Sequence, residues 1–205
     1  MANNHDMTLE DGDYVFGFGS LVALAELARY LGRAPLAPGE YALCSLLEYR
    51  RRWDIARDNA ADLPGRPHYI CAESGARLDV FVTSVNIGPH VGARVNGVAF
   101  RIGEADIARL DHREGNYDRI EVSGQIDREI PGRVWAYRGS AIAEARYRQG
   151  VAAGTAVVSR QYHDIVTDAF ASHGDDFLDA YHASTDAPEV PFQALRRVYP
   201  TGVEA

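Results

Sequence analysis

The sequence predicts an α+β fold in which a mixed, curled, barrel-like sheet is surrounded by helices. Strand-like segments dominate the first part of the chain with helices inserted between them, and helical segments collect after Ser140. A chain of 205 residues that is 46% hydrophobic can bury the core of one domain. We expect a flexible leader over residues 1–13, the domain over 14–187 and a tail over 188–205.

Hydrophobic periodicity and the positions of glycine and proline place the individual elements. Strand-like patterns predict strands over residues 14–18, 41–47, 51–56, 80–87, 94–102, 117–122 and 133–137. Helical spacing predicts helices over residues 20–31, 104–112, 141–149, 159–172 and 174–184. We expect the strands before and after Gly88 and Pro89 to pair with each other as a hairpin.

Charge and composition exclude several classes of function. The formal net charge of -8 disfavours a nucleic-acid partner, because neutralising phosphates requires clustered Lys and Arg. The one basic run, Arg50-Arg51-Arg52, is either a solvated strand end or a local site for an anionic substrate. Residues 14–31 form the longest apolar stretch, but glycines and charged residues interrupt it, so we expect no membrane span.

The cysteines and histidines indicate neither disulfides nor a metal site. Cys44 and Cys71 stand in apolar surroundings without a Cys-x-x-Cys pattern, which is typical of reduced core residues in a cytoplasmic protein. The polar segment before residue 14 does not resemble a secretory signal. The seven histidines lack close metal-ligand spacing. We expect a cytoplasmic protein that uses no metal and no cofactor.

The segment Gly17-Phe18-Gly19-Ser20-Leu21 joins the first predicted strand to the first predicted helix. Glycines permit positive φ and close approach of a ligand, and N–H groups at a helix start can bind a carboxylate. The segment lacks the third glycine of a dinucleotide fingerprint, the lysine of a phosphate loop and the second glycine of a nucleophile elbow. It is therefore either a cradle for a small anion or a turn that only packs.

A second informative segment, residues 110–119, lies where a helix ends and a strand begins. Charged and aromatic side chains at such a junction are often functional. Glu114 stands beside Gly115 and near Tyr117. The alternative is a solvated helix end in which Glu114 merely pairs with Arg113.

Four segments in the same order resemble the gamma-glutamylcyclotransferase superfamily. They are residues 16–21, residues 86–87 with 95–100 (similar to the central hairpin of that superfamily), residues 110–117 and residues 162–181. The resemblance covers about residues 14–184, with Phe18 in place of the usual tyrosine. Arg50-Arg51-Arg52-Trp53 is closer to the ChaC-like branch, whose glutathione motifs are otherwise incomplete in this chain.

The resemblance implies conversion of a γ-glutamyl amide to 5-oxoproline and a free amine or amino acid. Glu114 would be the catalytic general base and acid, since one carboxylate can serve both roles in turn. The backbone N–H groups of Gly19, Ser20 and Leu21, with Phe18, would hold the α-carboxylate of the substrate. Tyr117 would line the pocket or bind the carbonyl, or else pack on the core.

Several questions stay open at this point. The chain is either such an enzyme or a non-catalytic domain of the same fold that binds a small carboxylate or a partner protein. Residues 57–77 and 88–94 are expected to form the loops around the leaving group, but they do not indicate its identity. We expect a small-molecule γ-glutamyl substrate and no nucleic-acid or membrane partner, in either a monomer or a homodimer.

Overall fold

The computed structural model describes residues 9–61 and 67–199, in nine strands and five α-helices. The strands are β1 (Asp13–Gly17), β2 (Tyr41–Asp58), β3 (His68–Cys71), β4 (Phe81–Ile102), β5 (Tyr117–Glu121), β6 (Val134–Gly139), β7 (Ala156–Ser159), β8 (Phe192–Gln193) and β9 (Leu195–Val198). The helices are α1 (Leu24–Leu31), α2 (Glu104–Arg113), α3 (Ala141–Ala153), α4 (Arg160–Ala171) and α5 (Asp175–Ala183), with short 3₁₀ helices η1 (Ser20–Val22) and η2 (Ser123–Gln125).

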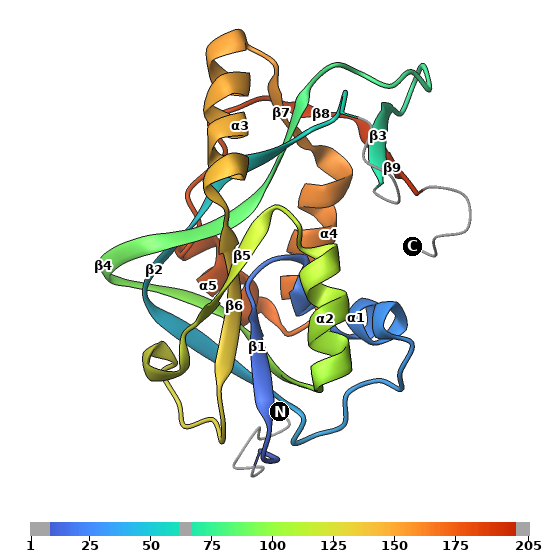
Figure 1. Ribbon diagram of the computed structural model, residues 1–205. Helices are drawn as coiled ribbons and strands as arrows, with labels where there is room; N and C mark the ends of the chain where they lie inside the picture. The colour runs from blue at the N-terminus through green and yellow to red at the C-terminus, as the bar shows by residue number, and fades with distance from the viewer. Residues whose placement is uncertain (1–8, 62–66, 200–205) are drawn as a thin grey trace.

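One large mixed sheet organises the molecule (Figure 1). Its strands follow the order β5-β6-β1-β4-β7-β8, and β2 pairs with β4 off this path. The pairs β1–β4 and β2–β4 are antiparallel, whereas β1–β6 and β4–β7 are parallel. The α+β prediction with a mixed sheet and surrounding helices is therefore confirmed.

The two longest strands, β2 and β4, form the centre of the sheet and bend together at the left of Figure 1. Both arms of β4 are rich in β-branched and aromatic residues that are almost fully buried, as Val85 and Phe100 are. The bend falls at a register shift between Leu47 and Tyr49, where Glu48 has a φ of 65°. Such bulges increase the curvature of a sheet.

The predicted hairpin over residues 80–102 is wrong. Both arms belong to the single strand β4 and pair with β2 rather than with each other, and Arg50 lies opposite Gly88 while Tyr49 lies opposite Pro89. The turn signals remain within a strand because the extra residues at this register shift lie on β4: only Glu48 separates Leu47 from Tyr49 on β2, whereas residues 90–93 separate Pro89 from Arg94. Pro89 therefore lies at the edge of an irregularity, where a residue without an N–H is tolerated. The predicted strands 41–47 and 51–56 likewise form the one strand β2.

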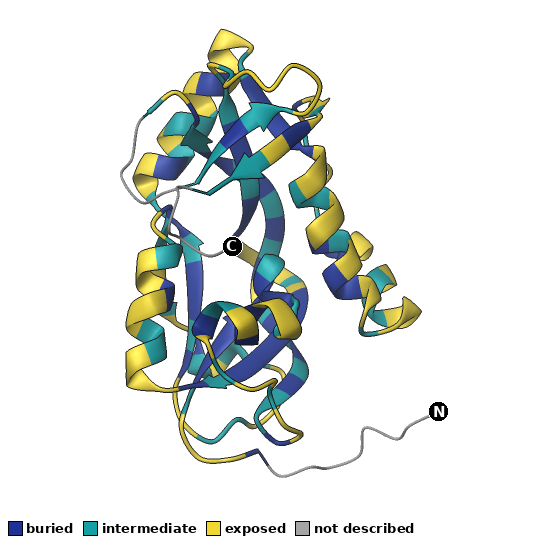
Figure 2. Cartoon of the chain, turned by 90° about the vertical axis from the view of Figure 1, so that its right-hand side faces the viewer, coloured by how far each residue is buried: buried dark blue, intermediate teal, exposed yellow. Residues whose placement is uncertain are grey.

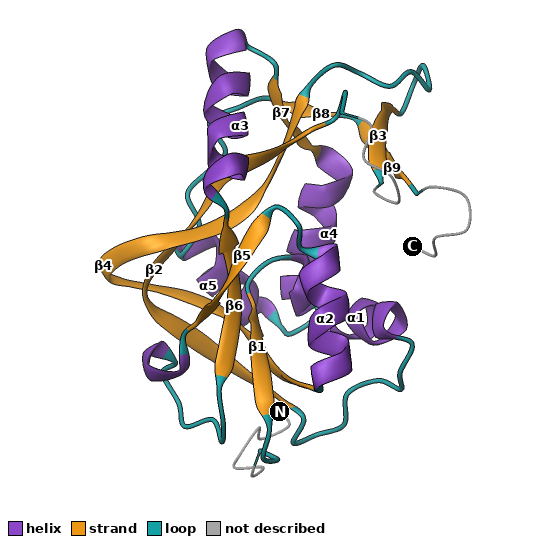
Figure 3. Cartoon of the chain, in the orientation of Figure 1, coloured by secondary structure: helices purple, strands orange, loops and turns teal. Residues whose placement is uncertain are grey.

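The helices cover the sheet and leave their polar faces to solvent (Figure 2). Helices α1 and α2 lie side by side (Figure 3), where Arg109 donates a 2.7 Å hydrogen bond to the Leu31 carbonyl oxygen. The helix predicted over residues 20–31 is interrupted at Ala23, with η1 before it and α1 after it. In the described ranges, the helices are too short or too polar to cross a membrane.

Both ends of the described chain are more ordered than the sequence indicated. Leu9, from the expected leader, is buried in the main core, while residues 1–8 lie outside the described residues. The expected tail instead contains β8 and β9, which pair with β7 and β3 and bury Leu195. These strands are short and pair with distant segments, so local periodicity did not reveal them.

Gly97 allows β1 and β4 to approach closely near the glycine-rich segment. A Cβ at this position would lie 2.3 Å from the Gly17 carbonyl oxygen and 2.6 Å from Phe16. We expect Gly97→Ala to lower the free energy of unfolding by about 1–3 kcal/mol, because the backbone must move apart. Denaturant titration measures this change, and Gly103→Ala is the matched control, since its Cβ would meet no atom within 4 Å. Equal stability of both variants would contradict the prediction.

Candidate functional site

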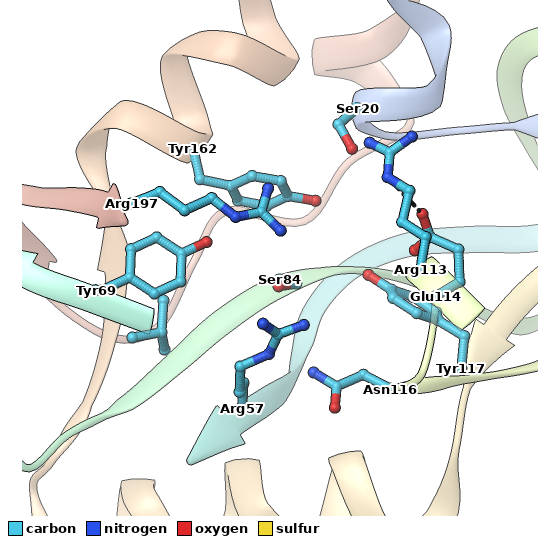
Figure 4. Close-up of a pocket in the computed structure, with 11 residues that line it drawn as sticks. Ser20, Arg57, Tyr69, Ser84, Arg113, Glu114, Asn116, Tyr117, Tyr162 and Arg197 are labelled. Atoms are coloured by element: carbon cyan, nitrogen blue, oxygen red, sulfur yellow. Dashed lines mark ion pairs between the residues drawn. The ribbon is translucent and has the colours of Figure 1, made fainter. Parts of the chain in front are cut away.

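A pocket forms where distant segments of the chain meet beside the large sheet. Its walls come from the start of η1, the end of β2, β3, β4, the junction between α2 and β5, helix α4 and strand β9. Figure 4 shows polar side chains pointing into the pocket from opposite sides. The lining residues are Ser20, Arg57, Tyr69, Val82, Ser84, Arg113, Glu114, Asn116, Tyr117, Tyr162 and Arg197.

The predicted acid, Glu114, is part of this pocket. It is the C-cap of α2, and its N–H donates to Leu110 while its carbonyl oxygen accepts from the Tyr117 N–H at 2.8 Å. This tight turn directs its side chain to the pocket, where only 15% of it is exposed. Arg113 Nε lies 3.4 Å from Glu114 Oε1. The pairing with Arg113 is therefore present, but the carboxylate lies in a pocket rather than at a solvated helix end.

Two tyrosines lie beside Glu114. The Tyr117 hydroxyl donates a 2.7 Å hydrogen bond to the Val85 carbonyl oxygen, so this hydroxyl can still accept a hydrogen bond from a ligand. Burial, followed by the nearby Tyr162 and Glu114, raises the pKa of Tyr117. Burial, followed by the charge of Glu114, also raises the pKa of Tyr162. Both phenols thus stay neutral at physiological pH.

The glycine-rich segment borders the same pocket through Ser20. Among the described residues, the backbone N–H groups of Gly19, Ser20 and Leu21 have no hydrogen-bond acceptor. Gly19 has a φ of −139°, so positive φ is not the reason for this glycine. Gly17 is required by close packing instead, because a Cβ there would lie 2.9 Å from Leu21 Cβ. The segment thus presents unpaired donors next to a pocket that contains an acid.

Arg51 holds the glycine-rich segment in place through a hydrogen bond to its backbone. It is fully buried, and its Nε donates a 2.8 Å hydrogen bond to the Phe18 carbonyl oxygen. Its guanidinium also bonds Asn96 and Ser184. Burial lowers the pKa of Arg51 to about 9. Neither a solvated strand end nor an anion site describes Arg51, which is a buried structural residue, whereas the side chains of Arg50 and Arg52 are partly exposed and pair with Asp186.

Several other residues that the sequence analysis predicted near the substrate do not line the pocket with their side chains. The Phe18 side chain packs in the core, only 6% exposed, and the Leu21 side chain packs in a second apolar cluster. Neither side chain lines the pocket, so they contribute at most backbone groups. Arg50 forms a surface ion pair with Asp186 and does not line the pocket. Residues 88–94 belong to β4 and contribute nothing to the pocket lining.

Sequence reasoning missed several pocket residues. Arg57 and Tyr69 fall in the expected loop over 57–77, of which residues 62–66 lie outside the described residues. Tyr162 lies in the helix predicted over residues 159–172, and Arg197 lies in the expected tail. No local pattern sets these residues apart, because the pairing of β3 with β9 brings Tyr69 and Arg197 together. In the described part of the chain, no three His, Cys, Asp or Glu side chains gather as a possible metal site.

Comparison with known proteins identifies the fold. No protein-family model and no curated protein sequence matches the chain. A solved structure named gamma-glutamyl cyclotransferase has a TM-score of 0.50 and 14% sequence identity, covering 86% of this chain and 88% of the other. An uncharacterized protein from Homo sapiens has a TM-score of 0.50 and 15% identity, covering 88% and 90%.

A third solved structure, YkqA from Bacillus subtilis, has a TM-score of 0.50 and 12% identity, and the match covers 85% of this chain and 54% of that chain. Identities this low are informative about backbone architecture and not about activity or substrate. The chain therefore has the fold of the gamma-glutamyl cyclotransferases.

Proposed function

We propose that this protein is a cyclotransferase that converts a γ-glutamyl amide to 5-oxoproline and a free amine or amino acid. The observation that carries the proposal is that a shielded carboxylate, Glu114, and Ser20 line one pocket, and that the segment around Ser20 has unpaired N–H groups at Gly19, Ser20 and Leu21. A carboxylate-bearing substrate that must gain and lose protons needs these two features.

In the proposed reaction, the α-amine of the glutamyl group attacks its own γ-carbonyl carbon. A nitrogen–carbon bond forms within the glutamyl group, and the bond to the leaving nitrogen breaks. Glu114 accepts a proton from the attacking amine and then donates it to the leaving nitrogen, so the enzyme returns to its starting state. Because the attack is intramolecular, the pocket chiefly has to hold the chain bent with the reacting atoms in contact.

The glycine-rich segment would bind the α-carboxylate of the glutamyl group. Its N–H donors are fixed by the Arg51–Phe18 hydrogen bond and need no reorganisation when substrate arrives. This places the amine near Glu114, on the neighbouring wall of the pocket. The neutral hydroxyl of Tyr117 can accept a hydrogen bond from the amine, and that of Tyr162 can donate one to the reacting carbonyl.

A panel of γ-glutamyl amino acids, γ-glutamyl amines and glutathione tests the proposal. We expect the purified protein to release 5-oxoproline from at least one of them in the presence of EDTA, because the proposed chemistry uses only protein groups. Absence of 5-oxoproline across the panel with a folded protein would favour a non-catalytic carboxylate-binding domain. Activity that depends on an added metal would contradict the mechanism.

Two substitutions distinguish backbone from side-chain contributions in the glycine-rich segment. A Cβ at Gly19 would make ordinary contacts, 3.7 Å from the Tyr162 hydroxyl and Val85, but the larger valine would extend from there toward the pocket. We therefore expect Gly19→Val to reduce kcat/KM far more than Ser20→Ala, which keeps every backbone donor. Steady-state kinetics on the best panel substrate measures both, and equal tolerance of the two changes would refute the carboxylate cradle.

A further inference from the structure

Asn116 lines the pocket, but the proposed chemistry assigns it no role. It lies in the turn between α2 and β5, two residues after Glu114. The Tyr117 N–H donates to the Glu114 carbonyl oxygen at 2.8 Å, and the Ser140 N–H donates to the Asn116 carbonyl oxygen at 3.0 Å. These bonds fix the backbone of the turn, and the Asn116 side chain points from it into the pocket (Figure 4).

The side-chain amide of Asn116 differs from those of the other buried asparagines. The described residues include four asparagines, all of them buried, and Asn116 is 9% exposed. The amide nitrogens of Asn59, Asn86 and Asn96 each donate to a protein oxygen. In the part of the chain that the structure describes, no group forms a hydrogen bond with the Asn116 side chain. Asn116 is thus the one buried asparagine there whose amide does not hold the fold together.

This amide is open to the pocket rather than sealed in the core. Among the described residues, Arg197 Nε is the only fully enclosed side-chain nitrogen or oxygen that lacks a hydrogen-bond partner. Both polar atoms of the Asn116 amide therefore reach open space, and the space that Asn116 lines is the pocket. An amide that is largely buried without a protein partner costs free energy, and a hydrogen bond to a ligand removes that cost.

The position of Asn116 indicates which atom of the proposed substrate it would meet. Figure 4 shows Ser20, Glu114 and Asn116 in this order along one wall of the pocket. With the α-carboxylate at the segment around Ser20 and the α-amine at Glu114, the γ-carbonyl beside the attacking amine lies toward Asn116. During the attack, the π electron pair of this carbonyl moves onto its oxygen, and it returns when the leaving nitrogen departs with a proton from Glu114. A donor at this oxygen acts chiefly in the transition state.

We propose that Asn116 is a further catalytic residue, whose side-chain N–H donates a hydrogen bond to the γ-carbonyl oxygen as this oxygen becomes anionic. The inference rests on the proposed function. It adds a second donor to the Tyr162 hydroxyl, which lies on the opposite side of the pocket (Figure 4). Because the turn that carries Asn116 is fixed by backbone hydrogen bonds, the donor needs no reorganisation when the charge develops.

Asn116→Ala tests this role on the compound of the γ-glutamyl panel that the wild-type protein turns over fastest. We expect kcat to fall about 10²- to 10³-fold, the usual effect of removing one such donor, while KM changes little. The thermal midpoint should stay near that of the wild type, because the lost amide bonds no described residue. Asp118→Ala is the matched control and should retain kcat, since Asp118 is exposed on β5 and lies outside the pocket.

Replacing the γ-carbonyl oxygen of the same compound with sulfur separates contact with this oxygen from a structural effect. Sulfur accepts hydrogen bonds weakly. We therefore expect the ratio of kcat for the oxygen compound to kcat for the sulfur compound to be about 10- to 100-fold smaller in Asn116→Ala than in the wild type. The intrinsic reactivities of the two compounds cancel in this comparison. Asn116→Asp keeps the shape of the side chain without the donor and should show the same reduced ratio, so it decides the matter if the alanine variant does not fold.

The outcomes separate this inference from the proposed function. A wild-type kcat in Asn116→Ala would overturn the role of Asn116 and leave the cyclotransferase intact. An equal loss on the oxygen and sulfur compounds would also overturn it, because the effect would then not depend on the carbonyl oxygen. If the wild-type protein releases no 5-oxoproline from any compound of the panel, the proposed function and this inference both fail.

Discussion

Glu114→Gln is expected to abolish 5-oxoproline release while leaving folding and substrate binding nearly intact. Glutamine keeps the shape of the side chain but cannot take up and return a proton, and acid–base groups contribute roughly 10²–10⁴ in rate. The ion pair with Arg113 is lost as well, but a single such pair contributes at most about 1 kcal/mol to stability when it is partly exposed. Steady-state kinetics and thermal unfolding measure the two effects separately.

Glu104→Gln is the matched control for this variant. Glu104 is an exposed glutamate in the first turn of the same helix, α2, and lies outside the pocket. It should retain full activity, whereas titration of Glu114→Gln with γ-glutamyl-alanine should show binding close to that of the wild type. Turnover of Glu114→Gln near the wild-type rate would remove Glu114 from the mechanism.

Arg51→Met is expected to cause the largest loss of stability. The substitution keeps the bulk of the side chain but removes the donors on which several buried acceptors depend, and each orphaned acceptor costs about 1–3 kcal/mol. Relief of the cost of burying a charge, which lowers the pKa of Arg51 to about 9, offsets part of this. We expect a net loss of about 2–4 kcal/mol. The acceptors are Phe18 O, Tyr181 O, Asn96 O, Ser184 Oγ and Thr185 Oγ1.

Arg50→Met is the control for Arg51→Met, because Arg50 is the neighbouring arginine on the same strand. Arg50 pairs with Asp186 at 2.8 Å but its side chain is 29% exposed, so Arg50→Met should cost less than about 1 kcal/mol. Denaturant titrations of both variants give the comparison. If Arg51→Met proves as stable as Arg50→Met, the buried network does not hold the glycine-rich segment in the way the hydrogen bonds indicate.

The two arginines also illustrate what the sequence could and could not predict. In the run Arg50-Arg51-Arg52, alternation along a strand implies two faces, but which face meets the core depends on packing against α4 and α5. Arg51 stacks on Phe170 and Tyr181, residues far along the chain. Burial of a charge is unusual without partners, and those partners are brought by the tertiary fold.

Local patterns were sufficient where a feature depends on neighbouring residues. The junction that carries Glu114 and Tyr117 was predicted from a helix pattern followed by glycine and a strand pattern, and the structure has α2 followed directly by β5. The hairpin at Gly88 and Pro89 failed because strand pairing is not local: β2 runs past both residues. Arg197 could not be predicted for the same reason, since only the pairing of β9 with β3 brings it to the pocket.

The most direct test of the central claim is to identify the product of γ-glutamyl-alanine formed in water enriched in oxygen-18. Intramolecular attack by the α-amine predicts 5-oxoproline and alanine, with no heavy oxygen in the 5-oxoproline, measured by mass spectrometry as the product forms. Glutamate carrying heavy oxygen in its γ-carboxylate would contradict the account, because it would show that water and not the α-amine attacks the carbonyl.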